Sequence, residues 1–212
     1  MKAFQDCRLY TFVDTAYLRG RAPEVVARQL CDGGSDVIQL RAKELSIEAA
    51  RQMAVKILSV TRAAGVPLVI NDHPQLAQEL GAEACHLGQE DFFDAGLTRA
   101  VELPGRAAGL QLGLSTHAPL QAERAVAAQP DYIAIGPIYP TGTKPTARPV
   151  TLEYVRWATA NVRIPWFAIG GVNLETLDAV LDAGASRVCV VSAILNAPDV
   201  TSACRAFRTR LD

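Results

Sequence analysis

The sequence alternates from one end to the other between short apolar runs and longer amphipathic stretches. Most of the runs are continuously apolar, which is typical of parallel strands covered on both faces. They predict strands at residues 9–13, 36–40, 67–70, 84–87, 111–114, 132–135, 166–169 and 187–191. Apolar residues at three- and four-residue spacing between them predict helices, most clearly at residues 23–31, 47–64, 119–128 and 174–183.

Eight strand–helix units in succession indicate a closed parallel α/β barrel, the TIM (β/α)8 fold. The competing architecture is a doubly wound open sheet, which would need a glycine-rich turn after the first strand. The chain has Val13-Asp14-Thr15-Ala16 there, without glycine. No linker or low-complexity tract divides the 212 residues, so we expect a single catalytic domain spanning 1–212, with short loops.

Charge and composition exclude several classes of partner. Lys plus Arg is 21 and Asp plus Glu is 22, a net charge of −1, which gives no overall field for nucleic acid or a membrane surface. No apolar run approaches the ~20 residues of a membrane span, and the N-terminus is too short and polar for a signal peptide. Five cysteines without a C-x-x-C pair argue against disulfides and zinc. We expect reduced thiols in a cytoplasmic protein.

Polar residues follow the predicted strands, at the barrel end where such folds carry their chemistry. After strand two, period-two spacing places Gln39, Arg41 and Lys43 on one face, and paired cations suit a polyphosphate. Strands three and four end in Asn71-Asp72 and Gly88-Gln89-Glu90-Asp91. Carboxylates here are also frequent helix caps, but two beside cations favour Mg²⁺, which takes one or two carboxylates and completes its shell with phosphate and water.

The remaining strands predict a second anion site, a neutral backbone nest after strands seven and eight, and add Lys144 of the strand-six loop to the first, cationic site. Strand six runs into residues 136–145, which include Thr141, Thr143 and Lys144; this segment could wrap an anion, form an ordinary surface loop or close as a lid. Strands seven and eight end in Gly170-Gly171 and Val191-Ser192, where barrels often bind phosphate through backbone N–H groups. Two phosphorylated substrates, or one with a phosphate at each end, would fill both sites.

Strand five ends in Ser115-Thr116-His117, just before the helix expected from Pro119. Ser115 could cap that helix or bond a ligand. His117 could carry a proton, although a single histidine at a helix start often has a structural role.

Seven fragments in this order resemble thiamine-phosphate synthase. They are Gln39-x-Arg41-x-Lys43, Ile70-Asn71-Asp72, His86-Leu87-Gly88-Gln89-x-Asp91, Gly113-x-Ser115-Thr116-His117, Gly136-Pro137-Ile138-Tyr139-Pro140-Thr141-x-Thr143-Lys144, Ala168-Ile169-Gly170-Gly171 and Val191-Ser192-Ala193-Ile194. The resemblance implies a transferase that couples hydroxymethylpyrimidine diphosphate to a thiazole phosphate and releases pyrophosphate, in thiamine biosynthesis.

The resemblance also implies roles for individual residues. Gln39, Arg41, Lys43, Asn71, Ser115 and Lys144 would bind the pyrimidine diphosphate, and Arg41, Lys43, Ser115 and Lys144 would be the catalytic residues among them. Asp72 and Asp91 would ligate Mg²⁺. Thr141, Thr143, Gly171, Val191 and Ser192 would bind the thiazole phosphate.

The chain departs from the family pattern at Thr151-Leu152, Ser186-Arg187 and Cys189, which bears on the shape of the thiazole pocket and on whether a plain or carboxylated thiazole is used. Three other functions stay open. A thiazole tautomerase would use His117 as an acid–base residue, a regulator would bind a thiamine precursor without turnover, and a sugar-phosphate isomerase would want a Glu or Lys base at a strand end. The sequence leaves the oligomeric state open and allows a homo-oligomer.

Overall fold

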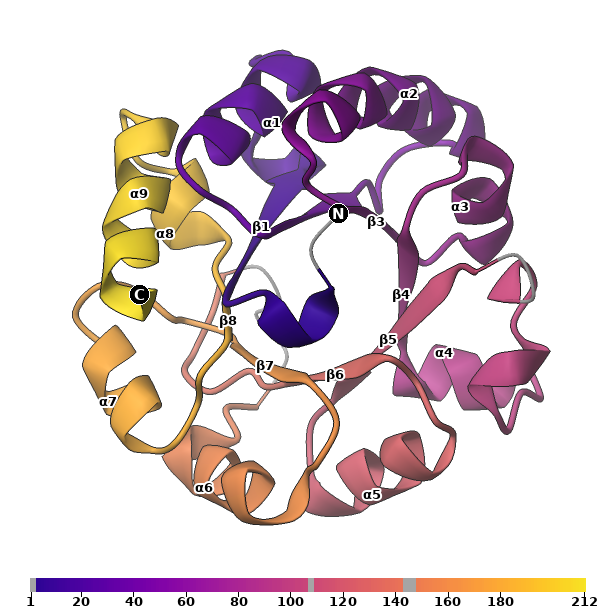
Figure 1. Cartoon of the computed structure of the whole chain (residues 1–212), viewed down its shortest axis with the longest axis vertical. Helices are drawn as coiled ribbons and strands as arrows, with labels where there is room; N and C mark the ends of the chain where they lie inside the picture. The colour runs from indigo at the N-terminus through magenta and orange to yellow at the C-terminus, as the bar shows by residue number, and fades with distance from the viewer. Residues whose placement is uncertain (1–2, 107–108, 143–147) are drawn as a thin grey trace.

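The computed structural model describes residues 3–106, 109–142 and 148–212. Its strands form a closed parallel barrel in which each strand pairs with its neighbours in chain order, and β8 pairs with β1 (Figure 1). The strands are β1 (Leu9–Asp14), β2 (Val37–Arg41), β3 (Leu68–Asn71), β4 (Ala84–Gly88), β5 (Gln111–Thr116), β6 (Tyr132–Ile135), β7 (Trp166–Ile169) and β8 (Val188–Cys189). The predicted TIM-barrel fold is confirmed.

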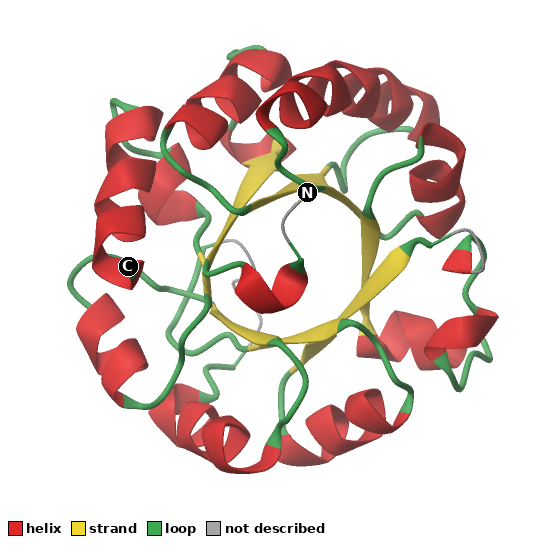
Figure 2. Ribbon diagram, viewed as in Figure 1, coloured by secondary structure: helices red, strands yellow, loops and turns green. Residues whose placement is uncertain are grey.

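Helices form a ring outside the barrel (Figure 2). They are α1 (Pro23–Asp32), α2 (Ile47–Ala64), α3 (Pro74–Leu80), α4 (Gln89–Asp94), α5 (Pro119–Ala127), α6 (Thr151–Asn161), α7 (Leu177–Asp182), α8 (Ser192–Leu195) and α9 (Val200–Leu211), with 3-10 turns η1 (Phe4–Asp6), η2 (Thr15–Tyr17) and η3 (Ala100–Glu102). In α2 the Ser46 hydroxyl accepts from Ala49 N–H, and Gly65 ends the helix in the left-handed conformation. In the part of the chain that the structure describes, no helix is long and apolar enough to cross a membrane.

Two predicted elements are shorter in the structure. The last strand was expected at residues 187–191 but spans only Val188–Cys189, because Val191 (φ −113°, ψ −86°) turns the backbone into α8. The helix expected at 174–183 is α7, Leu177–Asp182. Its predicted first turn is replaced by a tighter one, in which the Asn173 side-chain oxygen accepts from the N–H groups of Glu175 and Thr176.

Aromatic side chains close the amino-terminal end of the barrel. The short turn η1 lies across the centre of the ring of strands (Figure 2). From it, Phe4 stacks on Tyr132 with ring centroids 4.6 Å apart, and Phe167 meets the rings of Tyr10 and Tyr132 edge-on. All four side chains are buried. The barrel interior is therefore filled at this end and can open only at the other.

Three carboxylates repeat at this amino-terminal rim, one before each of β2, β4 and β6. Asp36 accepts from the N–H groups of Arg8 and Leu9, Glu83 from Leu68 N–H, and Asp131 from Leu112 N–H. Each carboxylate thus satisfies backbone donors at the start of the preceding strand, which lack a partner there. This rim is the end of the fold that serves stability.

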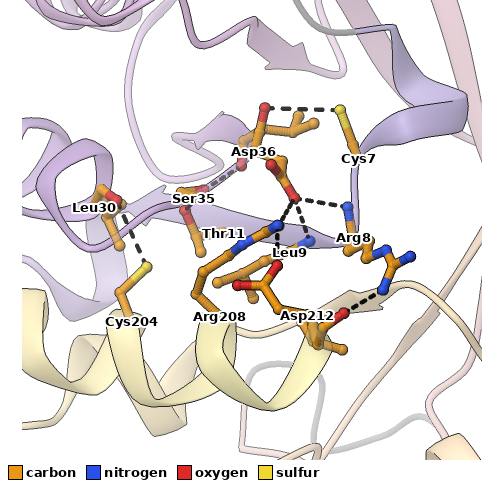
Figure 3. A network of polar contacts seen from close by, with 12 residues as sticks. Cys7, Arg8, Leu9, Thr11, Leu30, Ser35, Asp36, Cys204, Arg208 and Asp212 are labelled. Atoms are coloured by element: carbon orange, nitrogen blue, oxygen red, sulfur yellow. Dashed lines mark hydrogen bonds and ion pairs between the residues drawn. The ribbon is translucent and has the colours of Figure 1, made fainter.

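Asp36 also joins the first strand to the last helix (Figure 3). Its Oδ2 lies 2.7 Å from Arg208 Nη1 of α9, and Arg8 donates to the carbonyl of Leu211 near the end of that helix. The Asp36 side chain is only 8% exposed, so its charge interactions are poorly screened. These contacts hold α9 against the strand at which the barrel closes.

We expect Asp36→Asn to lower the free energy of unfolding by about 1.5–3 kcal/mol, because the hydrogen bonds from Arg208 and from the N–H groups of Arg8 and Leu9 lose a charged acceptor, and Arg208 keeps only the more exposed Asp212 as an ionic partner. Urea titration followed by circular dichroism measures this change. Asp178→Asn is the matched control, since it breaks an exposed ion pair with Arg210 and should cost under about 0.5 kcal/mol. Equal losses in the two variants would contradict the role given to Asp36.

Candidate active site at the carboxyl end of the barrel

A pocket of about 1070 Å³, including its open mouth, lies at the carboxyl ends of the strands. It collects every predicted site residue that falls within the described ranges: Gln39, Arg41, Lys43, Asn71, Asp72, Asp91, Ser115, Thr141, Gly171, Val191 and Ser192. Two further predicted residues, Thr143 and Lys144, lie outside the described residues. Residues predicted from separate stretches of the sequence therefore line one cavity.

Arg41, at the end of β2, is held by a buried carboxylate. Its Nη1 lies 2.9 Å from Oδ2 of Asp14, which ends the neighbouring strand β1 and pairs with Arg41 in the strand register. The Asp14 side chain is fully buried, and its Oδ1 accepts from Ala16 N–H. Asp14 thus fixes the guanidinium at the pocket wall, leaving its other N–H groups available for an anion.

Lys43 and Asp72 form the next contact along the rim, with Nζ 3.3 Å from Oδ2. Asp72 has a positive φ of 66°, which aspartate tolerates better than most residues, and its N–H donates to the carbonyl of His86 on β4. The pair leaves both ionic groups partly exposed to the pocket. A bound anion could therefore pair with the Lys43 ammonium, while the Asp72 carboxylate rotated to bind a cation.

Asp91 lies in the first turn of α4 and lines the same pocket. Its Oδ2 rests against the backbone of Gly88, where a Cβ atom would come within 2.6 Å of that oxygen. Neither Asp72 nor Asp91 caps a helix: His73 and Gly88 occupy the cap positions of α3 and α4. Both carboxylates remain available to a ligand.

These two carboxylates fit a magnesium ion. In the described ranges no group of three or more His, Cys, Asp or Glu side chains is placed to hold a metal, so a site enclosed by protein ligands alone is not formed there. Mg²⁺ commonly uses one or two carboxylates together with substrate phosphate and water. The two carboxylates that line the pocket and the cation–carboxylate pair at Lys43 are consistent with that arrangement.

Ser115 and His117 face the pocket from the end of β5. Ser115 lies within the strand and does not cap α5, whose cap residue is Ala118 without a side-chain hydrogen bond. His117 Nδ1 contacts the carbonyl oxygen of Gly136. Because a carbonyl oxygen can only accept a hydrogen bond, Nδ1 of His117 carries a proton. A second proton, on Nε2, is then what makes a histidine ring charged rather than neutral.

The opposite side of the pocket is largely backbone. Gly170 (φ 99°) and Gly171 (φ 67°) both adopt conformations that disfavour other residues. A Cβ on Gly170 would lie 2.3 Å from Pro137 Cβ, and one on Gly171 would lie 2.6 Å from Tyr139 Cβ. The glycines therefore let the segment after β6 pack against the end of β7, beside Val191 and Ser192.

Several pocket residues were not selected from the sequence. Tyr10, Phe12 and His86 line it and were given no role, since all three stand within predicted strands; Cys189, expected to bear on the shape of the pocket, lines it too. The alternation of Tyr10 and Phe12 along β1 is a signal that could have identified them, since period-two spacing points both inward. Burial raises the pKa of Cys189 well above its usual range, so its thiol stays protonated and is no nucleophile at neutral pH.

Among the departures from the family pattern, Arg187 is not at the thiazole side of the pocket. It lies at the amino-terminal end of β8 and donates to the carbonyl of Gln5. Arg187 was predicted at the start of the strand, where it is found, and from there it does not line the pocket, so the expectation that it bears on the shape of the thiazole pocket is wrong. Cys189 does line the pocket, whereas Thr151 is exposed at the start of α6.

The fold and pocket define a class: a (β/α)8-barrel protein with a cationic, carboxylate-bearing half and a backbone half at the carboxyl rim. Comparison with known families then gives the particular one. Residues 9–194 match the family described as Thiamine monophosphate synthase, and the chain belongs to that family.

Curated relatives agree with this assignment. A Thiamine-phosphate synthase of Thermus thermophilus is 46% identical over 180 residues, covering 84% of each chain. Another, from Halalkalibacterium halodurans, is 35% identical over 209 residues and covers 98% of this chain and 97% of its own. Among solved structures, Thiamine phosphate pyrophosphorylase from Pyrococcus furiosus superposes with a TM-score of 0.82 at 24% identity, over 98% of this chain and 96% of that one, and supports the fold. None of these matches favours the tautomerase, regulator or isomerase alternatives.

Proposed function

We propose that the protein is a thiamine-phosphate synthase, a transferase that joins 4-amino-2-methyl-5-hydroxymethylpyrimidine diphosphate to 4-methyl-5-(2-phosphoethyl)thiazole and releases pyrophosphate. The observation that carries the proposal is the division of one pocket into two unlike halves. Arg41, Lys43, Asp72 and Asp91 lie on one side, and the backbone around Gly171 on the other. Such a pocket suits a diphosphate that leaves and a monophosphate that stays.

In the proposed reaction, the pyrimidine carbon–oxygen bond breaks and its electron pair leaves with pyrophosphate. The thiazole nitrogen then donates its lone pair to the resulting carbocation, forming the carbon–nitrogen bond. Arg41, Lys43 and Lys144 would neutralise the charge that grows on the leaving group. No side-chain nucleophile is needed, which is consistent with a protonated Cys189 in the pocket.

The other residues would hold the two substrates. Gln39, Asn71 and Ser115 would bind the pyrimidine part of the first substrate. The thiazole phosphate would be bound by a set consisting of Thr141, Thr143, Gly171, Val191 and Ser192. Main-chain N–H groups around Gly171 would donate to this phosphate.

Asp72 and Asp91 would hold Mg²⁺. When bound, the ion would supply positive charge to the diphosphate and so favour its departure. The Lys43 ammonium, now 3.3 Å from Asp72, would move to the diphosphate oxygens as the carboxylate turned to the ion. We further propose one catalytic domain over 1–212, a cytoplasmic location, and a homo-oligomeric state that sedimentation analysis would test.

Pyrophosphate release tests the proposal directly. The purified protein is mixed with both phosphorylated precursors and Mg²⁺, and release is followed with each component omitted in turn. We expect release only when both substrates and the metal are present, and its loss in Asp72→Ala. No release from the unsubstituted protein, together with thiazole isomerisation that Asp72→Ala leaves unaltered, would overturn the proposal in favour of a tautomerase.

Lys144→Ala should separate chemistry from binding. If Lys144 acts on the leaving pyrophosphate, its removal slows turnover by about 100-fold or more, while KM for the thiazole phosphate changes only a few-fold. Steady-state kinetics with each substrate varied in turn measure both effects. Lys144→Arg keeps the charge and should recover part of the rate. A variant with normal kcat and a raised thiazole KM would instead place Lys144 at the second phosphate.

A further inference from the structure

Four polar side chains form a continuous hydrogen-bonded chain at the floor of the pocket. Gln39 Nε2 lies 2.8 Å from the Tyr10 hydroxyl, which lies 3.0 Å from the Tyr132 hydroxyl, and that hydroxyl lies 3.2 Å from His86 Nδ1. The residues come from β2, β1, β6 and β4, so the chain spans the barrel. Of the four, the function proposed above uses only Gln39.

The direction of each hydrogen bond in this chain follows from which atoms can donate and which can accept. Gln39 Nε2 can only donate, so the Tyr10 oxygen accepts and its own proton goes to the Tyr132 oxygen. Tyr132 then gives its proton to His86 Nδ1. Reversing the Gln39 amide would require every bond in the chain to reverse as well. The orientation of the Gln39 amide and the tautomer of His86 are therefore coupled: Gln39 Nε2 facing Tyr10 goes with a His86 ring that carries its proton on Nε2.

Burial keeps the two hydroxyls protonated, which the ordered chain requires. Both tyrosines lie inside the barrel, and this burial raises the pKa of Tyr10 and of Tyr132 well above the usual range. Each hydroxyl consequently has a proton to give at neutral pH. Neither can turn into an oxyanion, which would accept from both sides and break the direction of the chain.

The rings that carry the hydroxyls are also fixed. Tyr132 lies between the stacked ring of Phe4 and the edge-on ring of Phe167. Gly113 of β5 pairs with Tyr132 and with His86 in the strand register, and a Cβ at Gly113 would fall 2.1 Å from Tyr132 Cζ. The absence of a side chain at Gly113 thus gives the Tyr132 ring the room to reach His86.

We infer that the chain Tyr10–Tyr132–His86 orients the Gln39 amide so that its carbonyl oxygen faces the pocket and selects a ligand with an amine donor. The inference rests on the proposed function, in which Gln39 binds the aminopyrimidine. An exocyclic amine on the ring would donate to Gln39 Oε1, whereas a carbonyl at the same ring position would meet it as a second acceptor. Tyr10, Tyr132 and His86 are in this sense positioning residues for specificity.

The test compares two ligands: the 4-amino pyrimidine diphosphate and its 4-oxo analogue, bound without thiazole phosphate and measured by calorimetry. We expect the unsubstituted protein to bind the amine at least about tenfold more tightly, because the oxo group leaves two acceptors unsatisfied. Tyr132→Phe frees the Tyr10 proton for Gln39 Oε1, so the amide can turn. Tyr132→Phe should reduce the preference for the amine about tenfold, mainly by weakening the binding of the 4-amino ligand. Tyr10→Phe should also reduce it.

Tyr154→Phe is the matched control. It removes another buried hydroxyl with two hydrogen bonds, to Thr116 and to the Ala118 carbonyl, from outside the pocket, and should leave the preference unchanged. If Tyr132→Phe and Tyr10→Phe weaken both ligands equally, the role is structural and the inference is overturned. If the unsubstituted protein binds neither diphosphate and releases no pyrophosphate, the proposed function itself fails. Should Tyr132→Phe not fold, the comparison of Tyr10→Phe with Tyr154→Phe decides.

Discussion

Arg41→Ala should lower kcat/KM for pyrophosphate release by about 100- to 1000-fold and the free energy of unfolding by about 3–5 kcal/mol. The first loss is that of a cation placed on the leaving group. The second arises because Asp14, whose side chain is fully buried, would keep its charge without the guanidinium 2.9 Å away. A second substitution can separate the loss of activity from the loss of stability.

Adding Asp14→Asn to Arg41→Ala removes the unpaired charge. The amide can still accept from Ala16 N–H, so the backbone contact is kept. We expect the double variant to regain most of the lost stability and none of the activity. Urea titration and pyrophosphate release on the same preparations measure both. A double variant that regained activity would show that Arg41→Ala acts through folding rather than through the substrate.

Asp91→Asn should reduce turnover at limiting Mg²⁺ by at least about 100-fold, because an amide is a weaker ligand for a hard cation than a carboxylate. The loss should shrink as Mg²⁺ is raised, since added metal compensates for weaker binding by mass action. Titrating Mg²⁺ in the release assay measures the shift in its apparent affinity.

Asp94→Asn provides the control for this second variant. It lies three residues further along α4, is exposed and does not line the pocket, so it removes the same charge from the same helix. We expect less than about a twofold change. A loss in Asp91→Asn that is independent of Mg²⁺, or an equal loss in Asp94→Asn, would remove Asp91 from the metal site.

The sequence predicted the barrel because parallel strands buried on both faces leave a strong local signal. Each predicted strand begins at the observed first residue or next to it, and the pocket collects the polar residues that follow the strands. The length of the last strand was overestimated. Val190 N–H still donates to the Tyr10 carbonyl, but the turn at Val191 depends on the approach of α8, which composition does not encode.

The parts of the site that could not be predicted are those made by contacts between distant segments. Asp14 resembles any acidic residue after a strand until its register with Arg41 is known. Tyr10 and His86 lie within predicted strands and are buried, and the sequence gives neither a role of its own. Their polar ends are joined through the Tyr132 hydroxyl, and the Tyr132 ring has room there because Gly113 leaves space between β4 and β6. The local sequence pattern indicates on which face of a strand a side chain lies. It does not indicate which side chain from another strand it contacts inside the barrel.

The repeated carboxylates at the amino-terminal rim bear on how this protein could be engineered. Asp36, Glu83 and Asp131 tie strands together at the end away from the pocket, so substitutions that strengthen their surroundings should be separable from those that alter turnover. Thermostable variants are best sought there. One connection between the two ends is Phe4, which stacks on Tyr132 beneath the pocket floor. Library design should therefore hold that aromatic contact fixed while the rest of the rim is varied.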